Sequence, residues 1–299
     1  MEKEIFKIIV ICGPTASGKT KLALQLAKEY PRVNLLSVDS RQAYESLDIL
    51  TGKDIPGDLP PSISIFGHDL FKPDERANLA DFVRFSQDVI AQSIKEKVPL
   101  IIVGGTGLYL KAITQNLSNV LVPPDEKLRQ KLEKLSLEQL QNFLKEKDNK
   151  KFSTLNRSDS MNPRRLIRYI EIAQRPPHKG SQKLPTDTIK FIWFGLMPDK
   201  TTLKNNIHQR VLERLKKGVI AEVAHLLKKY PNRNLPIFSS LGVSPIIAFL
   251  DRKISESQLI DLWTKAEVDY ARRQVVWFKK QPEIIWYDKD IDKIVLKNA

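Results

Sequence analysis

Residues 13–20 read GPTASGKT and match the phosphate-binding pattern G-x-x-x-x-G-K-[ST] at every required position. Such a loop joins a buried strand to a helix, because its backbone N–H groups must meet the phosphate at the helix N-terminus. The preceding residues 5–12, IFKIIVIC, are apolar and β-branched, as a buried parallel strand requires. A helix is expected near 18–29. The motif therefore predicts a strand, loop and helix unit.

The loop itself is predicted to bind a di- or triphosphate. Its N–H groups can point into one concavity, and the helix N-terminus adds a partial positive charge. Lys19 is expected to lie along the terminal phosphates, and Thr20 is expected to hold a magnesium ion. The predicted phosphate-binding residues are Gly13, Pro14, Thr15, Ala16, Ser17, Gly18, Lys19 and Thr20.

Further strands and helices alternate along the chain. VNLLSV at 33–38, VPLIIV at 98–103 and IKFIWFGL at 189–196 have strand character, and 77–96 has the spacing of an amphipathic helix. This alternation indicates an α/β fold, a P-loop parallel sheet with helices on both faces.

The pattern changes after about residue 113 to long polar helices. We expect a P-loop α/β core at 1–112, a helical insertion domain at 113–187, and a segment at 188–299 that completes the core and adds basic C-terminal helices.

The net charge of +14 is unevenly distributed. Residues 1–120 hold 14 Lys and Arg against 14 Asp and Glu, so the whole excess lies in 121–299. A basic segment beside a neutral one favours a polyanionic partner such as nucleic acid, because neutralised phosphates release counterions. A lysine-rich surface that serves only solubility is the alternative.

Composition also bears on the compartment. No apolar run is long enough to span a bilayer, so no membrane partner is expected. The opening residues leave no room for a secretion signal before the glycine loop. Cys12 is the only cysteine, which excludes an internal disulfide and suits a reducing compartment. We expect a cytoplasmic protein in which Cys12 is a small core residue.

Two polar positions follow predicted strands, where open α/β sheets bind their ligands. Asp39 follows VNLLSV and could act as a magnesium ligand or a general base, or it could cap the next turn. Thr106 lies in GGTG after VPLIIV. It could orient a reacting group beside glycines that admit a substrate, or cap a tight turn.

Five motifs in order resemble one enzyme family. GPTASGKT, DSRQAY, VPLIIVGGTGLYLKA, NPRRLIRYIE and YARRQVVWFKK resemble the tRNA dimethylallyltransferases, also called tRNA isopentenylpyrophosphate transferases. The resemblance covers residues 7–288. It implies transfer of the dimethylallyl group from dimethylallyl diphosphate to N6 of adenosine 37, beside the tRNA anticodon, with release of diphosphate.

The resemblance also assigns roles. It makes Asp39 the general base for the N6 proton and Thr106 its partner near the amine and the diphosphate. It places Arg210 near the diphosphate, implies Mg2+ as the cofactor, and makes the insertion domain part of the tRNA site. We expect the enzyme to bind the tRNA anticodon stem-loop as a monomer. The implied tRNA contacts are Ser40, Arg41, Gln42, Arg129, Arg164, Arg165, Arg168, Arg272, Arg273 and Gln274.

The chain departs from the family pattern at four places. Arg164 replaces a glutamine, and Arg272 replaces a lysine. Val243 stands where the family has tyrosine, and the family's histidine pair is missing before the segment that contains Asp69, Pro73 and Glu75.

Three other functions remain open. A free-adenylate isopentenyltransferase would share the core but need no RNA clamp, and the basic second half argues against it. A small-molecule P-loop kinase would transfer phosphate, and a non-catalytic RNA-binding protein would keep a relict nucleotide loop.

Overall fold

The computed structural model describes residues 5–115, 117–175, 184 and 187–287. The chain divides into two compact units, one made of 1–114 with 184–299 and the other of 115–183. We expected the corresponding boundaries at 113 and 187. The two units are called here the sheet unit and the insertion unit.

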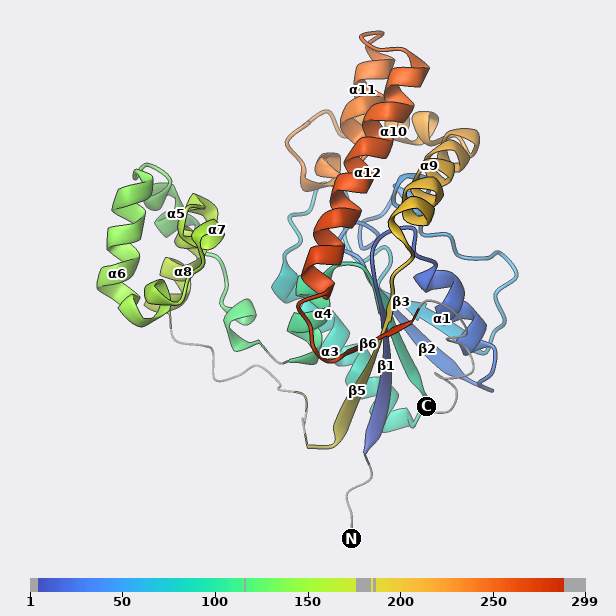
Figure 1. The fold of residues 1–299 in the computed structure, drawn as a ribbon, viewed down its shortest axis with the longest axis horizontal. Coiled ribbons are helices and arrows are strands. Elements are labelled where there is room, and N and C mark those ends of the chain that lie inside the picture. Colours follow the sequence, from blue (N-terminus) through green and yellow to red (C-terminus); the bar gives the residue numbers. More distant parts are fainter. Residues whose placement is uncertain (1–4, 116, 176–183, 185–186, 288–299) are drawn as a thin grey trace. The chain divides into compact units, whose positions relative to one another are not determined.

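A six-stranded, all-parallel sheet forms the centre of the sheet unit (Figure 1), with the order β3-β2-β4-β1-β5-β6. The predicted parallel α/β fold is confirmed. The short strand β3 was not predicted, because four residues show too little periodicity to distinguish them from a loop. The strands are β1 (Phe6–Cys12), β2 (Val33–Val38), β3 (Ile63–Phe66), β4 (Leu100–Gly104), β5 (Ile189–Leu196) and β6 (Ile284–Tyr287).

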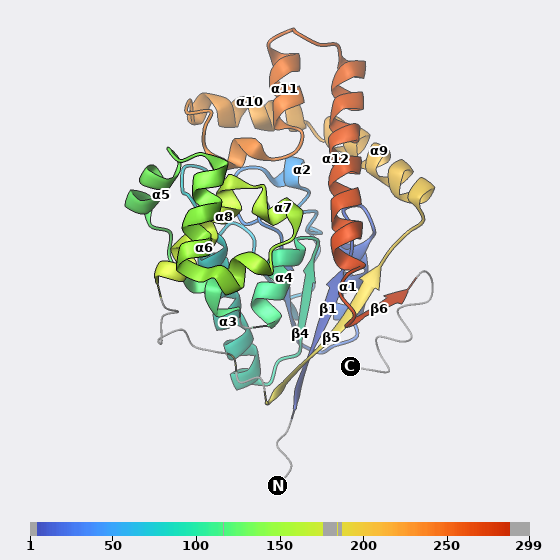
Figure 2. The same ribbon diagram turned by 60° about the vertical axis from the view of Figure 1, so that its left-hand side comes forward.

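Helices cover both faces of this sheet (Figure 2). α1 (Lys19–Ala27) buries Leu22 and Leu26 against side chains of β1, β2 and β4. α3 (Leu79–Glu96) and α4 (Gly107–Thr114) lie on the other face. A capping box at Asn78 fixes the start of α3, because the Asn78 side chain accepts from two backbone N–H groups of the first turn. The core is therefore closed on both sides.

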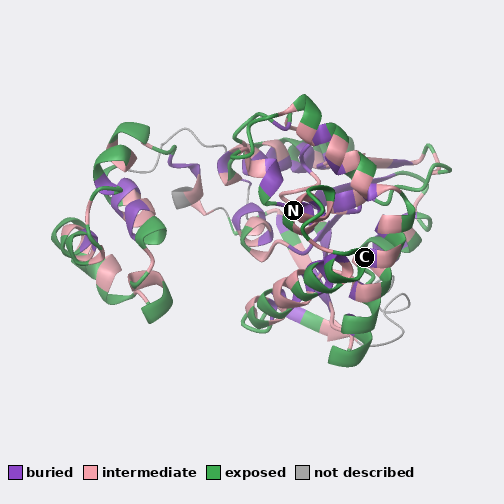
Figure 3. Cartoon of the chain, turned by 90° about the horizontal axis from the view of Figure 1, so that it is seen from above, coloured by how far each residue is buried: buried purple, intermediate pink, exposed green. Residues whose placement is uncertain are grey.

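A helical group extends from the carboxyl edge of the sheet. It contains α2 (Asp48–Thr51), α9 (Lys200–Lys216), α10 (Val219–Lys229), α11 (Val243–Leu250) and α12 (Glu256–Phe278). Its core is centred on Trp263 of α12, whose side chain is fully buried among residues of α2, α10 and α11. Burial is concentrated in the sheet and along the inward faces of the helices (Figure 3). No helix in the described residues is long and apolar enough to cross a membrane.

The insertion unit has a small core of its own. Its helices are α5 (Glu126–Leu132), α6 (Leu137–Ser153), α7 (Arg157–Ser160) and α8 (Pro163–Gln174). Leu140 and Leu144 of α6 pack on Leu166 and Ile170 of α8, and all four side chains are almost completely buried. The insertion unit therefore has a hydrophobic cluster separate from those of the sheet unit.

A buried carboxylate of α8 ties this helix to α5 and its N-cap. Glu171 is fully buried and accepts two hydrogen bonds from Arg129, at 2.7 and 3.0 Å. It also accepts from Arg168 at 3.2 Å and from the backbone N–H of Asp125 at 2.9 Å. Burial alone would raise the pKa of Glu171, but these donors hold that pKa below its usual value.

Replacing Glu171 by Gln should destabilise the insertion unit by about 3 kcal/mol, because the two arginines keep their charge and lose its partner. Because the folded pKa of Glu171 is depressed, the wild-type stabilisation is present above pH 4.5 and is lost as pH falls through the folded value. Amide hydrogen exchange of α6 and α8 measures both effects. The exposed Glu146→Gln substitution is the control and should change the exchange free energy by less than about 0.5 kcal/mol.

Candidate active site

Three neighbouring strands end at the same level of the sheet. Gly104 of β4 is aligned with Val38 of β2 on one side and with Cys12 of β1 on the other. The loops that follow these strands therefore begin side by side. They carry the three predicted motifs, which are the phosphate loop, the segment that begins at Asp39, and the Gly-Gly-Thr turn.

The phosphate loop has the backbone that its sequence predicts. Gly18 has φ of 90°, which favours glycine, and α1 begins at the next residue. Lys19 folds back across the loop and donates to the carbonyl oxygen of Pro14 at 2.5 Å. The Ser17 hydroxyl is buried, with no hydrogen-bond partner among the described residues. The loop thus presents donors around one concavity.

The pKa of Lys19 is lowered, mainly by burial. Burial and the nearby guanidinium of Arg210 lower the pKa of Lys19 to about 8, against the opposing effect of the Asp39 carboxylate. The Lys19 ammonium is therefore easier to deprotonate here than in water. An anion bound beside it would raise the pKa again and favour the charged form.

A cavity of about 330 Å³ opens onto the three loops. Thr15, Lys19 and Thr20 of the phosphate loop line it together with Asp39. Its other walls come from the loop after η2 (Pro236–Ser239) and from α9 and α12. The cavity is large enough to hold a small diphosphate ester beside a planar acceptor group.

Asp39 performs the capping role and still faces the cavity. Its Oδ1 accepts from the backbone N–H of Arg41 at 2.8 Å, as in a cap of the following turn. No described residue donates a hydrogen bond to its other oxygen, Oδ2, and the residue lines the cavity. One carboxylate can therefore hold the turn with one oxygen and accept a proton with the other.

Tyr270 lies near Asp39 and beside Thr106. The Thr106 hydroxyl is buried and makes no hydrogen bond of normal geometry to a described residue. Burial and, secondly, the Asp39 carboxylate raise the pKa of Tyr270 to about 12, so its phenol stays protonated. Tyr270 lines the same cavity and can donate a hydrogen bond there.

The glycines of GGTG make room for the protein itself. A Cβ on Gly105 would lie 2.6 Å from the side-chain nitrogen of Gln274, and one on Gly107 would lie 2.2 Å from the ring of Trp277. Gly104 and Gly105 also line the cavity, so the interpretation that these glycines admit a substrate stays a prediction. Gly105 and Gly107 allow α12 to pack closely on the turn.

Arginines of α9 complete the cationic wall. Arg210 donates to the Thr15 hydroxyl at 3.2 Å, so its guanidinium lies beside the phosphate loop. Its proximity to a diphosphate stays a prediction. Arg214, one turn further along, is buried and pairs with Glu267 of α12 at 3.0 Å. The second pair joins α9 to α12 and leaves the Arg214 charge compensated.

Known proteins resemble this chain over nearly its whole length. A family model described as IPP transferase matches residues 42–281. The chain belongs to the IPP transferase family.

Individual relatives agree with this assignment. A tRNA dimethylallyltransferase of Finegoldia magna is 35% identical, with 98% of this chain and 96% of that protein covered. One of Gloeothece citriformis is 34% identical, with 94% and 91% covered. The crystal structure of the tRNA isopentenylpyrophosphate transferase of Bacillus halodurans aligns with a TM-score of 0.70 at 28% identity, covering 98% of this chain and 94% of its own.

A more distant structure shares the fold. A eukaryotic dimethylallyltransferase acting on tRNA aligns with a TM-score of 0.78 at 22% identity, and the alignment covers 95% of this chain and 74% of that chain. The helical additions to the sheet are therefore a feature of the fold that these proteins share.

The predicted tRNA residues of this IPP transferase occupy different environments. Ser40 and Arg41 line the cavity, and Arg41 also donates to the Pro236 carbonyl oxygen at 2.7 Å. Gln42 accepts from the Ser37 hydroxyl at 2.8 Å and donates to the Gly52 carbonyl oxygen at 2.8 Å. The Gln42 amide thus holds the loop that carries Asp39.

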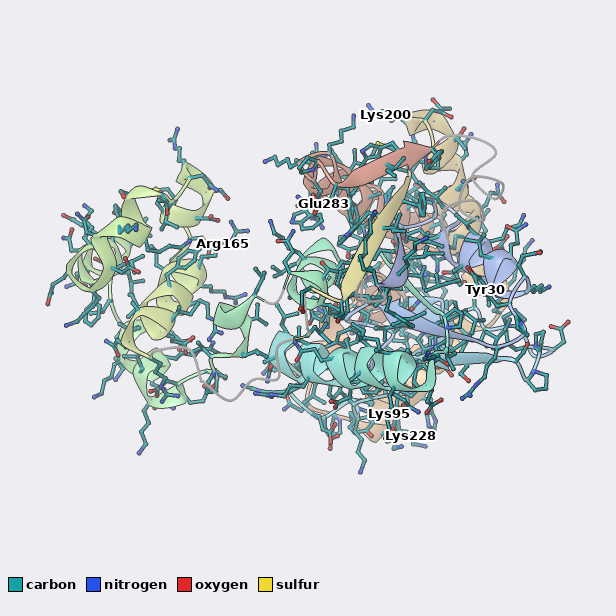
Figure 4. The ribbon with its side chains drawn as sticks, turned by 90° about the horizontal axis from the view of Figure 1, so that it is seen from below. Tyr30, Lys95, Arg165, Lys200, Lys228 and Glu283 are labelled. Atoms are coloured by element: carbon teal, nitrogen blue, oxygen red, sulfur yellow. The ribbon has the colours of Figure 1, made fainter. Side chains whose placement is uncertain are left out.

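In the insertion unit the four predicted arginines divide into two kinds. Arg129 and Arg168 bind Glu171, as described above. Arg164 is exposed at the start of α8, and Arg165, which Figure 4 labels, pairs with Asp159. Arg164 and Arg165 are exposed and can donate to a ligand without breaking a bond to the buried Glu171 carboxylate.

The three predicted residues of α12 also differ. Arg272 is exposed and lies 3.6 Å from Asp269, whereas Arg273 lines the cavity beside Tyr270. Gln274 is buried and bonded within the protein. Their one-residue spacing on a helix turns them 100° apart, so they cannot all face one ligand.

Sequence reasoning missed several residues of the site. Tyr270, Arg214 and Glu267 line the cavity but belong to helices that read as ordinary amphipathic segments. A signal was present, because Glu267 and Gln274 are polar residues seven apart and so lie on one face of α12.

One departure from the family pattern lies away from the cavity lining. Val243, where the family has tyrosine, is buried in the core around Trp263.

Affinity for inorganic diphosphate should weaken as pH rises from 7 to 9, because Lys19 loses its charge near pH 8. The expected fall is about tenfold relative to Lys19→Arg, whose guanidinium stays protonated. Isothermal titration calorimetry measures the affinity of both proteins at each pH. The ionisation of diphosphate affects both proteins equally, so it does not change the ratio of their affinities. Parallel pH profiles for the two proteins would contradict the assignment.

Proposed function

We propose that this IPP transferase is a tRNA dimethylallyltransferase that acts on N6 of adenosine 37 and releases diphosphate. The observation that carries the proposal is one cavity that is lined by the phosphate loop, by Asp39 and by Gly104 and Gly105 of the turn that contains Thr106. Family membership and the names of the relatives support the same reaction.

The phosphate loop holds the leaving group in this proposal. Its N–H groups, Lys19 and Arg210 would stabilise the negative charge that develops as the bond between carbon 1 of the dimethylallyl group and oxygen breaks. In this reaction the loop assists the transfer of an alkyl group, and no phosphoryl group is transferred.

The residues present fit a magnesium ion. Thr20 supplies a hydroxyl oxygen at the cavity wall, and the described residues contain no cluster of three or more His, Cys, Asp or Glu that could enclose a metal. Mg2+ accepts such a site, since it needs few protein ligands when phosphate oxygens complete its shell. When bound, it would add positive charge to the departing diphosphate.

The acceptor would bind between Asp39 and Thr106. As the N6 lone pair attacks carbon 1, the electron pair of the carbon–oxygen bond passes to diphosphate and the N6 proton passes to the Asp39 carboxylate. The Thr106 hydroxyl lies beside the Tyr270 phenol and can accept or donate a hydrogen bond at the amine. Tyr270 stays protonated and can orient either partner.

Adenosine must leave the anticodon loop stack to reach this cavity. Extrusion of a base costs a few kcal/mol, and an unpaired loop lowers that cost. The exposed Arg164 and Arg272, with the basic excess of 121–299, would bind tRNA phosphates and compensate for it.

The decisive experiment incubates the protein with dimethylallyl diphosphate, magnesium and unmodified tRNA, and then analyses the nucleosides by mass spectrometry. An added five-carbon group on adenosine is expected. Prenylated AMP with unmodified tRNA would instead identify a free-adenylate enzyme, label transfer from γ-labelled ATP a kinase, and tRNA binding without diphosphate release a non-catalytic protein.

Asp39→Asn should lower the turnover number by about 10³-fold, because the amide cannot accept the N6 proton. The amide oxygen still accepts from Arg41 N–H, so the turn should remain folded and tRNA should bind within about threefold of wild type. Single-turnover kinetics and a filter-binding assay separate the two effects. A variant that loses its fold would show that capping is the main role of Asp39.

Binding of tRNA should weaken steeply with salt, and Arg164→Ala should lower the slope of log K against log salt concentration by about 1. Arg84→Ala is the matched control, since Arg84 is an exposed arginine on α3, away from the cavity. Fluorescence anisotropy with labelled tRNA at several salt concentrations measures both slopes. Equal slopes for the two variants would remove Arg164 from the tRNA site.

A further inference from the structure

Gln274 connects two of the catalytic loops. Its Oε1 accepts from the backbone N–H of Thr15 at 2.8 Å, and its Nε2 donates to the carbonyl oxygen of Gly105 at 2.8 Å. The side chain is 7% exposed, so neither bond competes with bulk water. A buried amide with both ends bonded is well ordered, because losing either partner leaves an unsatisfied polar group.

The two bonded residues lie on opposite sides of the reacting bond in the proposed reaction. Thr15 belongs to the loop that holds the diphosphate, whereas Gly105 directly precedes Thr106. Cys12 and Gly104 are aligned across β1 and β4, so the bridge closes a short gap between the loops that leave these strands. The side-chain amide of Gln274 alone spans this gap.

Each end of the bridge is supported from a second direction. The Thr15 hydroxyl accepts from Arg210, so α9 holds the side chain of the residue whose backbone α12 holds. α12 is itself fixed two turns earlier, where Glu267 pairs with Arg214 at 3.0 Å. Gly105 has no side chain to push the amide away, since a Cβ there would lie 2.6 Å from Nε2.

Both hydrogen-bonding atoms of the Gln274 amide are engaged within the protein, although the residue also lines the cavity. The neighbouring Arg273 lines the cavity with a guanidinium and Arg272 is exposed, so the two arginines carry the charge that a phosphate would meet. Sequence position alone groups the three residues, but burial separates them.

We infer that Gln274 is a positioning residue that sets the separation between the diphosphate loop and the Gly-Gly-Thr turn. This inference rests on the proposed function and adds to it a residue that acts by holding two loops of the site at a fixed distance. The separation matters because a displacement of about 1 Å between reacting groups can cost about 100-fold in rate.

The test replaces Gln274 by Met, which has similar length and removes both hydrogen bonds. The turnover number with saturating substrates should fall by about 30-fold, while the dissociation constant of tRNA should change by less than about threefold. Amide exchange at Thr15, followed by NMR in the full chain, should become at least about tenfold faster. Gln281→Met is the control. Gln281 follows α12, and its side-chain amide donates only to the carbonyl oxygen of Trp277 within that helix.

Two results would overturn the inference. Weakened tRNA binding with an unchanged turnover number would make Gln274 a nucleic-acid contact, and unchanged exchange at Thr15 would show that the bridge is absent in solution. If the Met variant does not fold, Gln274→Asn serves instead, because it keeps the polar amide but is one methylene too short to reach both partners. Its turnover number should also fall, and wild-type turnover would refute the bridge.

The proposed function can fail separately. A wild-type protein that transfers no dimethylallyl group to tRNA would refute the reaction, whereas the Thr15 exchange measurement needs no substrate and still decides whether Gln274 holds the loop.

Discussion

The alignment of β2, β4 and β1 at their carboxyl ends is the constraint on which the site depends. Parallel strands in register must release their chains at one edge, and here Val38, Gly104 and Cys12 lie level across the sheet. A phosphate loop, a carboxylate and a hydroxyl from distant parts of the sequence therefore meet without any long connection. The close-packed sheet beneath them supplies the rigidity that catalytic geometry needs.

α12 turns this open edge into a cavity. Its buried Trp263 anchors it to the helical group, Glu267 pairs with Arg214, and Gln274 reaches both catalytic loops. Glycines in the Gly-Gly-Thr turn allow the helix to approach so closely. One helix thus provides the wall of the cavity, part of its charge and the spacing of its loops.

Charge is used in two ways along the basic half of the chain. Arg129, Arg168 and Arg214 are paired with buried carboxylates and stabilise the fold, because removing either partner would leave a poorly solvated charge. Arg164 and Arg272 remain exposed, where a polyanion can reach them. A count of basic residues cannot separate these groups, since pairing depends on distant segments.

The sequence by itself determined the parallel α/β class and the phosphate loop, and it made Asp39 a candidate site residue at a strand end, because strand periodicity and loop geometry are local properties of the chain. Only the tertiary structure decided which residues share the cavity. Tyr270 carries no local signal, and the sequence named Gln274 only as a tRNA contact. Both residues enter the site because α12 packs across loops more than 160 residues away. Their roles follow from burial and hydrogen-bond partners, which are properties of the packed chain and not of any segment of it.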